Sequence, residues 1–348
     1  MSDVVIITGS GGLIGSCAAN YYLKLGYKVV GIDNNSREVF FGPEASVIPS
    51  ILELKDNKNY EHHYADIANY DQIKVPFNKY GKNVYAVIHS AAQPSHDWAL
   101  KDIERDFLSN AYGTLNVGKA FRNFCSDSVL IHCSTNKVFG DAPNKLNFIE
   151  TDTRYDFADE KYKNGIDETM TIDNSVHSFF GVSKLYADVF VQELGKNLGL
   201  KTGVFRGGCL TSVRSGAHKS VELHGFLSYI VKCAKEGRHY KVFGNGKRVR
   251  DQLHSEDVLG MFNEFIKNPK QGEVYNMGGE KENSISILET INKLREDFDL
   301  TLKYELLIGK ERTGDHVCYY TDMTKFRKDF PEWKKLYSLD RIFNELNI

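Results

Sequence analysis

The sequence lacks several features that would place it in a membrane, around a metal or on a nucleic acid. No apolar run approaches twenty residues, and no basic stretch precedes an apolar segment at its start, so we expect neither a membrane span nor a signal peptide. The six cysteines are scattered without a C-x-x-C pair, which argues against a zinc site and for reduced thiols in the cytoplasm. A formal net charge of -2 gives no reason to expect a nucleic acid or an anionic membrane as partner.

A glycine-rich turn follows the first apolar run of the chain. Residues 4–7 are β-branched and apolar, which is typical of a buried parallel strand, and Gly9, Gly12 and Gly15 follow before a helical segment. A turn without side chains lets the backbone approach a pyrophosphate, and the free N–H groups of the next helix attract it. This position in the chain predicts a dinucleotide-binding site.

Asp33 ends the second apolar run, residues 28–33, about twenty residues after the glycine turn. A carboxylate there can accept hydrogen bonds from ribose hydroxyls and would repel a 2′-phosphate, so we expect NAD rather than NADP. Arg37 weakens that preference, because an arginine nearby can pair with such a phosphate. The alternative interpretation of Asp33 is a turn residue at the end of a strand.

Further apolar runs recur at the spacing of βαβ units, at residues 60–64, 86–89, 129–132 and 200–206. Strands that alternate with helical segments predict an α/β fold, a doubly wound parallel Rossmann sheet with its ligand at the carboxyl edge. Residues 275–279 read as a last strand that returns to this sheet. We therefore expect a Rossmann domain and a smaller mixed α/β domain that are not simple consecutive halves.

Several motifs along the chain resemble the extended short-chain dehydrogenase/reductases that modify nucleotide sugars. Besides the glycine turn and Asp33, the resemblance is carried by residues 66–67 (Asp-Ile), 89–92 (His-Ser-Ala-Ala), 110–114 (Asn-Ala-Tyr-Gly-Thr), 134–135 (Ser-Thr), 181–184 (Gly-Val-Ser-Lys) and 250–251 (Arg-Asp). Their order and spacing together are highly specific, and they cover nearly the whole chain. The resemblance implies an NAD-binding domain over 1–206, with re-entry around 251–279, and a nucleotide-sugar-binding domain over 207–250 and 280–348.

A narrower resemblance is to the CDP-tyvelose (CDP-paratose) 2-epimerases. It rests on residues 134–141 (Ser-Thr-Asn-Lys-Val-Phe-Gly-Asp), 150–155, 164–168 and 283–289. Such enzymes oxidise a sugar carbon with bound NAD and return the hydride to the opposite face. The related 4,6-dehydratases typically carry Thr-Asp-Glu where this chain has Thr-Asn-Lys at 135–137, and since loss of water needs an acid and a base there, a 4,6-dehydratase is the poorer interpretation.

The resemblance also implies roles for individual residues, an NAD cofactor, a nucleotide-sugar substrate and a cytoplasmic homodimer that serves carbohydrate biosynthesis such as that of lipopolysaccharide. The dimer would use the helices that follow Ser95 and Phe179. Asp66 would lie near the adenine, Asn110 would support the central helix, and Lys184 would hold the nicotinamide ribose. The residues expected to bind the cofactor are Gly9, Gly12, Leu13, Ile14, Asp33, Asn34, Asp66, Ile67, Ala91, Ala92, Asn110 and Lys184.

At the substrate, Thr135 would bond the reacting hydroxyl, and Arg250 and Arg312 would clamp the diphosphate, since a guanidinium matches phosphate oxygens bidentately. The alternative for both arginines is a solvated basic turn paired with acids. The residues expected at the substrate are Thr135, Asn136, Lys137, Arg250 and Arg312.

The catalytic pair of this family, Tyr-x-x-x-Lys, is incomplete in this chain. A spacing of four puts both side chains on one helix face, where the lysine lowers the pKa of the phenol that takes the proton. The position four before Lys184 is Phe180, which cannot carry a proton. The catalytic positions are therefore Thr135, Lys184 and Phe180, the last as the place of the missing tyrosine.

Three explanations of Phe180 remain open: another group acts as base, the substitution was engineered to hold substrate, or the protein binds a nucleotide sugar without turnover. We prefer the first, and the candidate bases are Cys209, His177 and Lys184. An epimerase is the leading hypothesis. The alternatives are a dehydrogenase or dehydratase with a different base and a non-catalytic nucleotide-sugar-binding protein.

Three shorter segments also carry local structural signals. Gly-Asn-Gly at 244–246 predicts a hairpin between strands on either side. Residues 221–227 read as a loop that runs into a helix, and residues 157–173 as an acidic insertion that is either a flexible flap or a solvated loop.

Overall fold

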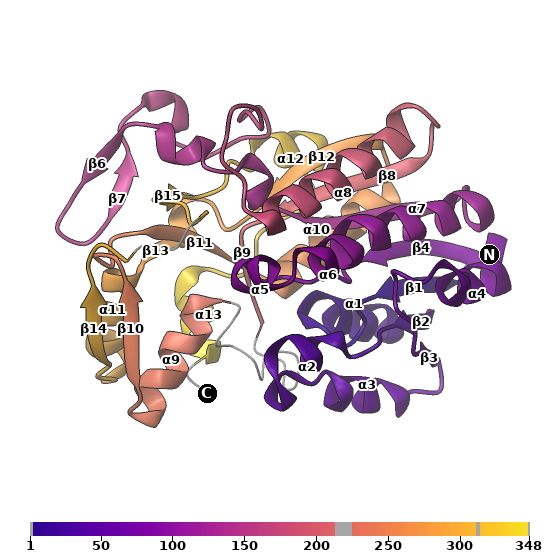
Figure 1. Cartoon of the computed structure of the whole chain (residues 1–348), viewed down its shortest axis with the longest axis horizontal. Coiled ribbons are helices and arrows are strands. Elements are labelled where there is room, and N and C mark those ends of the chain that lie inside the picture. The colour runs from indigo at the N-terminus through magenta and orange to yellow at the C-terminus, as the bar shows by residue number, and fades with distance from the viewer. Residues whose placement is uncertain (1–2, 213–224, 311–313, 347–348) are drawn as a thin grey trace.

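A parallel sheet of seven strands forms the centre of the molecule (Figure 1), in a computed structural model that describes residues 3–212, 225–310 and 314–346. The strand order is β12-β8-β5-β4-β1-β2-β3, and every neighbouring pair is parallel. This is the predicted doubly wound Rossmann sheet. The strands are β1 (Val4–Thr8), β2 (Lys28–Ile32), β3 (Tyr60–His63), β4 (Val84–His89), β5 (Val129–Thr135), β8 (Lys201–Gly207) and β12 (Gln271–Met277).

Helices cover both faces of the sheet, which explains why its strands are apolar without alternation. Val5 and Ile7 of β1 belong to one buried cluster, and Val4 and Ile6 to another on the opposite face. The first cluster is completed by helices α1 (Leu13–Lys24), α3 (Ile48–Lys55), α10 (Ser255–Lys267) and α12 (Thr324–Asp329). The second is completed by α4 (Tyr70–Tyr80), α7 (Gly113–Phe124) and α8 (Phe179–Lys196).

Shorter helical segments follow the strand ends. They are α2 (Ser36–Phe41), η1 (Pro43–Ala45), η2 (Gly81–Asn83), α5 (His96–Lys101), α6 (Ile103–Phe107), the π-helical turn η3 (Leu108–Tyr112), η4 (Asn136–Phe139), η5 (Ala142–Lys145), η6 (Glu160–Tyr162) and η7 (Lys281–Asn283). No helix in the described ranges is long and apolar enough to cross a lipid bilayer.

The C-terminal half adds two small sheets and a helical cluster. Strand β11 (Val249–His254) pairs with β9 (Cys209–Thr211), β13 (Ser284–Ser286) and β15 (Cys318–Tyr319), while β10 (His239–Phe243) pairs in parallel with β14 (Lys303–Leu307). Helices α9 (Phe226–Glu236), α11 (Ile287–Phe298) and α13 (Leu339–Leu346) share one apolar core beside them. The predicted loop at 221–224 lies outside the described residues, and the helix that it was expected to enter is α9.

The prediction of a hairpin around Gly-Asn-Gly at 244–246 is wrong. Strands β10 and β11 flank this turn but belong to different sheets. The backbone groups of the turn bond to distant segments instead, since Gly244 N–H donates to Leu307 O and Leu288 N–H donates to Gly246 O. The turn therefore carries the chain from one sheet to the next.

The insertion at 157–173 is exposed over most of residues 158–164, as predicted for a solvated loop, but its later part is fixed to the fold. It follows a small hairpin of β6 (Phe148–Glu150) and β7 (Tyr155–Phe157), and its Ile166 is fully buried. The side chain of Asn276 on β12 donates to Ile166 O at 2.9 Å, and its backbone N–H donates to the Glu168 carboxylate at 2.6 Å. These bonds fasten the insertion to the edge of the central sheet.

Two glycines set the distance between α8 and the edge strand β12. A Cβ on Gly195 would lie 2.0 Å from the backbone nitrogen of Gly272, and a Cβ on Gly272 would lie 2.4 Å from the carbonyl oxygen of Gln192. Gly272 also has a positive φ of 73°. The helix and the strand therefore touch backbone to backbone, and any side chain at either position would push α8 away.

We expect Gly195→Ala to lower the free energy of unfolding by about 1–3 kcal/mol, because overpacking outweighs the gain in helix propensity of at most about 1 kcal/mol. Urea denaturation measures this change. Gly260→Ala is the matched control, since its Cβ within α10 would meet only the Trp333 side chain, at 3.1 Å. Equal stabilities of wild type and Gly195→Ala would contradict the close packing.

Candidate active site

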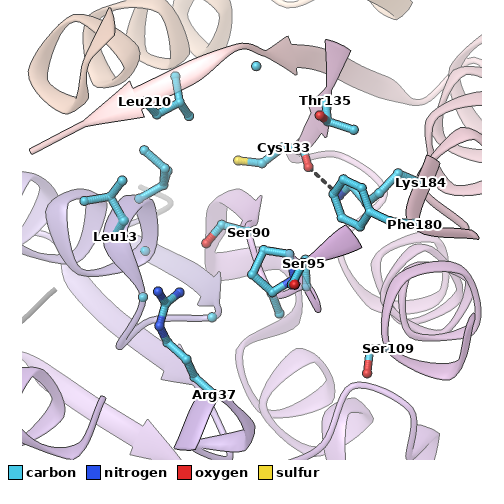
Figure 2. A pocket seen from close by; sticks show the side chains of 18 of the residues that line it. Leu13, Arg37, Ser90, Ser95, Ser109, Cys133, Thr135, Phe180, Lys184 and Leu210 are labelled. Carbon is cyan, nitrogen blue, oxygen red and sulfur yellow. Dashed lines mark hydrogen bonds between the residues drawn. The ribbon is translucent and has the colours of Figure 1, made fainter. Parts of the chain in front are cut away.

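One cavity of about 510 Å³ runs along the carboxyl edge of the sheet, past the ends of β1, β2, β3, β4, β5 and β8 (Figure 2). Nearly all of the residues predicted for the site line it. They are Gly9, Gly12, Leu13, Ile14, Asp33, Asn34, Asp66, Ile67, Ala91, Ala92, Thr135, Asn136, Lys137, Phe180, Lys184 and Arg250. Arg312 lies outside the described residues, and Asn110 does not line the cavity.

The glycine turn after β1 leaves no room for side chains. A Cβ on Gly9 would lie 2.7 Å from the backbone nitrogen of Ala91, and a Cβ on Gly15 would lie 2.0 Å from Gly9 O. Gly12 caps α1 without a side-chain hydrogen bond, so the first N–H groups of that helix face the cavity edge with their dipole. Such a bare cradle fits the diphosphate of the predicted dinucleotide.

Asp33 lies at the end of β2 and is held by backbone donors. Gly11 N–H donates to one carboxylate oxygen at 3.0 Å, and Asn35 N–H donates to the other at 2.8 Å. Burial raises the pKa of Asp33 and lowers that of Arg37 to about 10, while the opposite charges of the two groups counteract both shifts. An acid in this fixed orientation fits ribose hydroxyls, although Arg37 lines the same part of the cavity.

Asp66 and Ile67 form the wall beyond β3. Arg105 donates to the Asp66 carboxylate at 3.0 Å, and Ala68 N–H donates to it at 2.9 Å. Ile67 packs on Gly113 of α7, where an added Cβ would lie 2.6 Å from its Cδ1. Asp66 and Ile67 lie at the end of the cavity next to the edge strand β3, which is consistent with the expected contact between Asp66 and an adenine.

Asn110 is fully engaged in a buried network behind the cavity. Its side chain accepts a hydrogen bond from Gln93 N–H at 2.9 Å and donates to Asp106 and Ser183 at 3.0 and 3.1 Å. This geometry suits the expected support of the central helix. Asn110 does not line the cavity, so its predicted contact with the cofactor has no support in this geometry.

Thr135, Lys184 and Phe180 lie at the end of the cavity formed by β5 and α8. The Lys184 ammonium donates to the carbonyl oxygen of Cys133 at 2.7 Å, a bond marked in Figure 2. Burial lowers the pKa of Lys184 to about 8. Phe180 is 7% exposed and precedes Lys184 by one helical turn, so the helix face expected to be catalytic carries the lysine and a ring that has no hydroxyl.

Of the candidate bases named from the sequence, Cys209 and Lys184 line the cavity. Burial raises the pKa of the Cys209 thiol to about 11, which keeps it protonated at neutral pH. His177 is not among the lining residues, and its Nε2 pairs with Ile172 O at 3.0 Å. The raised pKa therefore disfavours Cys209 as the base, and its place outside the cavity lining disfavours His177.

His96, at the start of α5, is a lining residue that the sequence reasoning missed. Its ring centroid lies 4.8 Å from that of Phe180, and its Nδ1 lies 2.8 Å from Ser178 Oγ. The only signal for it in the sequence is a histidine a few residues after the small residues that end a strand, which by itself is weak.

The far end of the cavity carries a cluster of charges. Arg250 donates to the Asp315 carboxylate at 2.6 Å and to the carbonyl oxygens of Val249 and His316, while Lys137 donates to Gly314 O at 3.0 Å. Although burial favours the neutral acid, Arg250 and Lys137 hold the pKa of Asp315 well below its usual range. Burial lowers the pKa of Lys137 to about 8.

Among the described residues that line this end, the two cations Lys137 and Arg250 face the one anion Asp315, and this positive balance fits a phosphate-bearing ligand. Several N–H groups of the Arg250 guanidinium nevertheless donate hydrogen bonds to protein groups. This agrees with the alternative interpretation, in which the arginine is paired with an acid. Its contact with a diphosphate stays a prediction.

Comparison with known proteins agrees with this geometry. Residues 5–278 match the model of the NAD dependent epimerase/dehydratase family. The chain is 30% identical to a CDP-paratose 2-epimerase from Salmonella typhi over 92% of its own length and 91% of that protein. Among solved structures, a dTDP-glucose 4,6-dehydratase from Bacillus anthracis with NAD has a TM-score of 0.76 at 19% identity, with 99% of this chain and 95% of that one covered.

A tyrosine-to-phenylalanine variant of a UDP-glucuronic acid 4-epimerase from Bacillus cereus, in complex with a UDP-sugar and NAD, has a TM-score of 0.75 at 22% identity, with 99% of this chain and 96% of that one covered. At these identities the solved structures show a shared fold.

We expect the buried ammonium of Lys184 to make stability depend on pH. Because its pKa falls from 10.5 to about 8 on folding, the unfolded chain holds more protons between these values, so the contribution of Lys184 to the free energy of unfolding rises with pH through this window. It is complete above pH 10.5 and is lost as the pH falls through about 8.

Urea denaturation of wild type and Lys184→Met between pH 7 and 10.5 measures the effect, with Lys196→Met, at the exposed end of the same helix, as control. A difference between wild type and Lys184→Met that stays constant with pH would contradict burial of the cation.

Proposed function

The chain belongs to the NAD dependent epimerase/dehydratase family, and on that basis we propose that it is a nucleotide-sugar epimerase. It would oxidise one carbon of the sugar and return the hydride to the opposite face, most simply C2 of a CDP-sugar, in keeping with the 30% identity to a CDP-paratose 2-epimerase. The observation that carries the proposal is the single cavity that joins the glycine turn, Thr135 with Lys184, and the positive cluster at Arg250.

NAD is the cofactor of this family, and its nicotinamide ring, when bound, accepts and returns a hydride. The bare turn at Gly9 and Gly12 and the fixed carboxylate of Asp33 are the residues that would hold it. We propose that Lys184 supports the nicotinamide ribose with its ammonium. Because the same NAD returns the hydride, no second redox substrate is required.

Thr135 would orient the reacting hydroxyl from the end of β5. The next two positions, Asn136 and Lys137, carry an amide and an ammonium where the related dehydratases typically carry two carboxylates. Without that acid and base, elimination of water has no proton route at this place. This contrast supports an epimerase over a 4,6-dehydratase.

We further propose that residues 207–250 and 280–348 bind the nucleotide part of the substrate. Arg250 and Lys137 would attract the diphosphate through their net positive charge, and Arg312 would complete the clamp. The same assignment makes this enzyme a step in carbohydrate biosynthesis, since its product is itself a nucleotide sugar.

Two other functions are compatible with the structure. A dehydrogenase or dehydratase with a different base fits the same fold. A protein that binds a nucleotide sugar without turnover fits Phe180, since a phenyl ring cannot exchange a proton.

We expect hydride abstraction despite Phe180. Rapid mixing of the NAD-loaded protein with a panel of CDP-, UDP-, GDP- and dTDP-sugars should give a rise at the absorbance band of the reduced nicotinamide with one of them. Silence across the panel, with binding confirmed by thermal stabilisation, would contradict an epimerase and favour the non-catalytic alternative. Phe180→Tyr separates the two: a binder that lacks only the phenol gains turnover, whereas an enzyme with another base gains little.

We also propose that the protein is a homodimer. Apolar side chains on neighbouring helices α5, α6 and α8 are exposed in the single chain, namely Leu100, Ile103, Phe107, Phe179, Val182, Tyr186 and Val189. Pairing of this face with a second copy would bury them.

Sedimentation velocity tests the dimer. Val182→Glu places a charge in the middle of the exposed face, on a residue that is 52% exposed, and should shift the protein to a monomer. Val75→Glu, on the exposed side of α4 at 50%, is the control and should leave the assembly unchanged. A wild-type monomer at micromolar concentration would contradict the proposed dimer.

A further inference from the structure

The structure brings an imidazole to the place where the family's phenol is missing. His96 and Phe180 line the same cavity, and their rings are 4.8 Å apart between centroids with an angle of 59° between their planes. We propose that His96 exchanges the proton of the reacting sugar hydroxyl in place of the absent tyrosine. This inference rests on the epimerase proposed above.

Ser178 orients the imidazole. Its Oγ lies 2.8 Å from His96 Nδ1 and also accepts the Gly181 N–H at 3.1 Å, as the N-cap of α8. A hydroxyl oxygen has two lone pairs, so it can accept from Gly181 and from a protonated Nδ1 together. Proton exchange is then assigned to Nε2, and the bond from Nδ1 persists when the ring becomes a cation. A base oriented by a third group is the arrangement that proton transfer requires.

The segment that leads to His96 is rigidly supported. Gln93 donates to the Asp106 carboxylate at 2.7 Å and to Ser95 O at 2.9 Å, and Ser95 caps α5 by accepting the Trp98 N–H. On the other side, Ser183 of α8 donates to the second oxygen of Asp106 at 2.6 Å. The loop that carries His96 and the helix that carries Phe180 are therefore joined through one buried carboxylate, which fixes the two rings relative to each other.

Other groups at this end of the cavity are less suited to the role. The Cys209 thiol is protonated at neutral pH, and the ammonium of Lys184 donates to Cys133 O. The ammonium of Lys137 donates a hydrogen bond to Gly314 O, and its Nζ lies 3.5 Å from Asp315 Oδ1. Among the described residues that line the cavity, His96 is the only histidine, and an imidazole exchanges protons near neutral pH, where its ordinary pKa is about 6.5.

The proposed step balances in protons and electrons. The C–H bond of the carbinol would break, and its hydrogen would leave with both bonding electrons, as a hydride, to the nicotinamide of bound NAD. The O–H bond breaks at the same carbon, its proton moves to His96 Nε2, and the carbon–oxygen bond becomes a carbonyl. On return of the hydride to the opposite face, His96 gives the proton back, so neither the imidazole nor the cofactor is changed over the cycle.

Charged groups from several elements line the cavity together with His96 in the part of the chain that the structure describes. They are Asp97 on α5, Lys184 on α8, Lys137 on η4, Asp315, Arg250, and Asp33, Arg37 and Asp66 toward the other end. Lys184 and Lys137 oppose protonation of the ring, whereas Asp97 and Asp315 favour it.

Single-turnover mixing of the NAD-loaded protein with CDP-paratose tests the proposal. We expect His96→Gln to slow formation of the reduced nicotinamide by about a hundred- to ten-thousand-fold and to abolish the single ionisation in its pH profile. Binding of CDP-paratose, measured by calorimetry, should remain within about threefold, since general acid–base catalysis acts on the transition state. His177→Gln is the matched control, because this histidine does not line the cavity, and it should behave as wild type.

Two further measurements keep the outcome unambiguous. The double variant His96→Gln with Phe180→Tyr should recover hydride transfer, because a phenol then stands beside Lys184. In nitrogen-15 spectra of labelled histidine, the signal lost in His96→Gln should be the one that shifts when CDP-paratose binds. Full activity and an unchanged pH profile in His96→Gln, or no shift of its signal, overturns the role of His96 alone. No hydride transfer by the wild-type protein with any sugar that binds overturns the proposed epimerase and the catalytic role together.

Discussion

The backbone-to-backbone contact of α8 with the edge of the sheet is the constraint on which the site depends. Gly195 and Gly272 permit the approach, and a buried ion pair fixes it, since Arg206 of β8 holds Asp188 of α8 with bonds of 2.9 and 3.0 Å. Ser134 of β5 donates to the same carboxylate at 2.6 Å. A helix anchored to two strands in this way presents its first turns to the cavity in one orientation, and removal of either ion partner would leave a buried charge unpaired.

The anchored orientation of α8 also fixes the position of the buried Lys184 ammonium. One helical turn before Lys184, Phe180 stands where a tyrosine was expected, so this lysine has no phenol beside it at that position. Its charge lies near two buried histidines, and burial followed by the nearby Lys184 lowers the pKa of His89 to about 3 and that of His132 well below its usual value. Both rings are therefore neutral beneath the cavity. We propose that the positive charge of Lys184 acts instead on the bound cofactor and on the oxygen of the reacting sugar carbon.

Local patterns predicted the sheet and most of the site, because buried parallel strands, the glycine turn and the spacing of Phe180 and Lys184 are all written in short stretches of sequence. Features that depend on contacts between distant segments could not be predicted from these local patterns. His96 gains its place only when Asp106 joins its loop to α8. The turn at residues 244–246 resembles a hairpin locally, yet its backbone partners lie at Leu307 and Leu288.

We propose that this chain moves a hydride at a sugar carbon without a catalytic tyrosine. The most direct measurement is the reaction of the NAD-loaded protein with CDP-paratose in heavy water, followed by proton NMR of the epimerised sugar. We expect the inverted carbon to keep the hydrogen that it carried in the substrate, because that hydrogen leaves and returns as hydride without exchange with solvent. Deuterium at the inverted carbon would rule out hydride transfer and would point to removal and return of a proton instead.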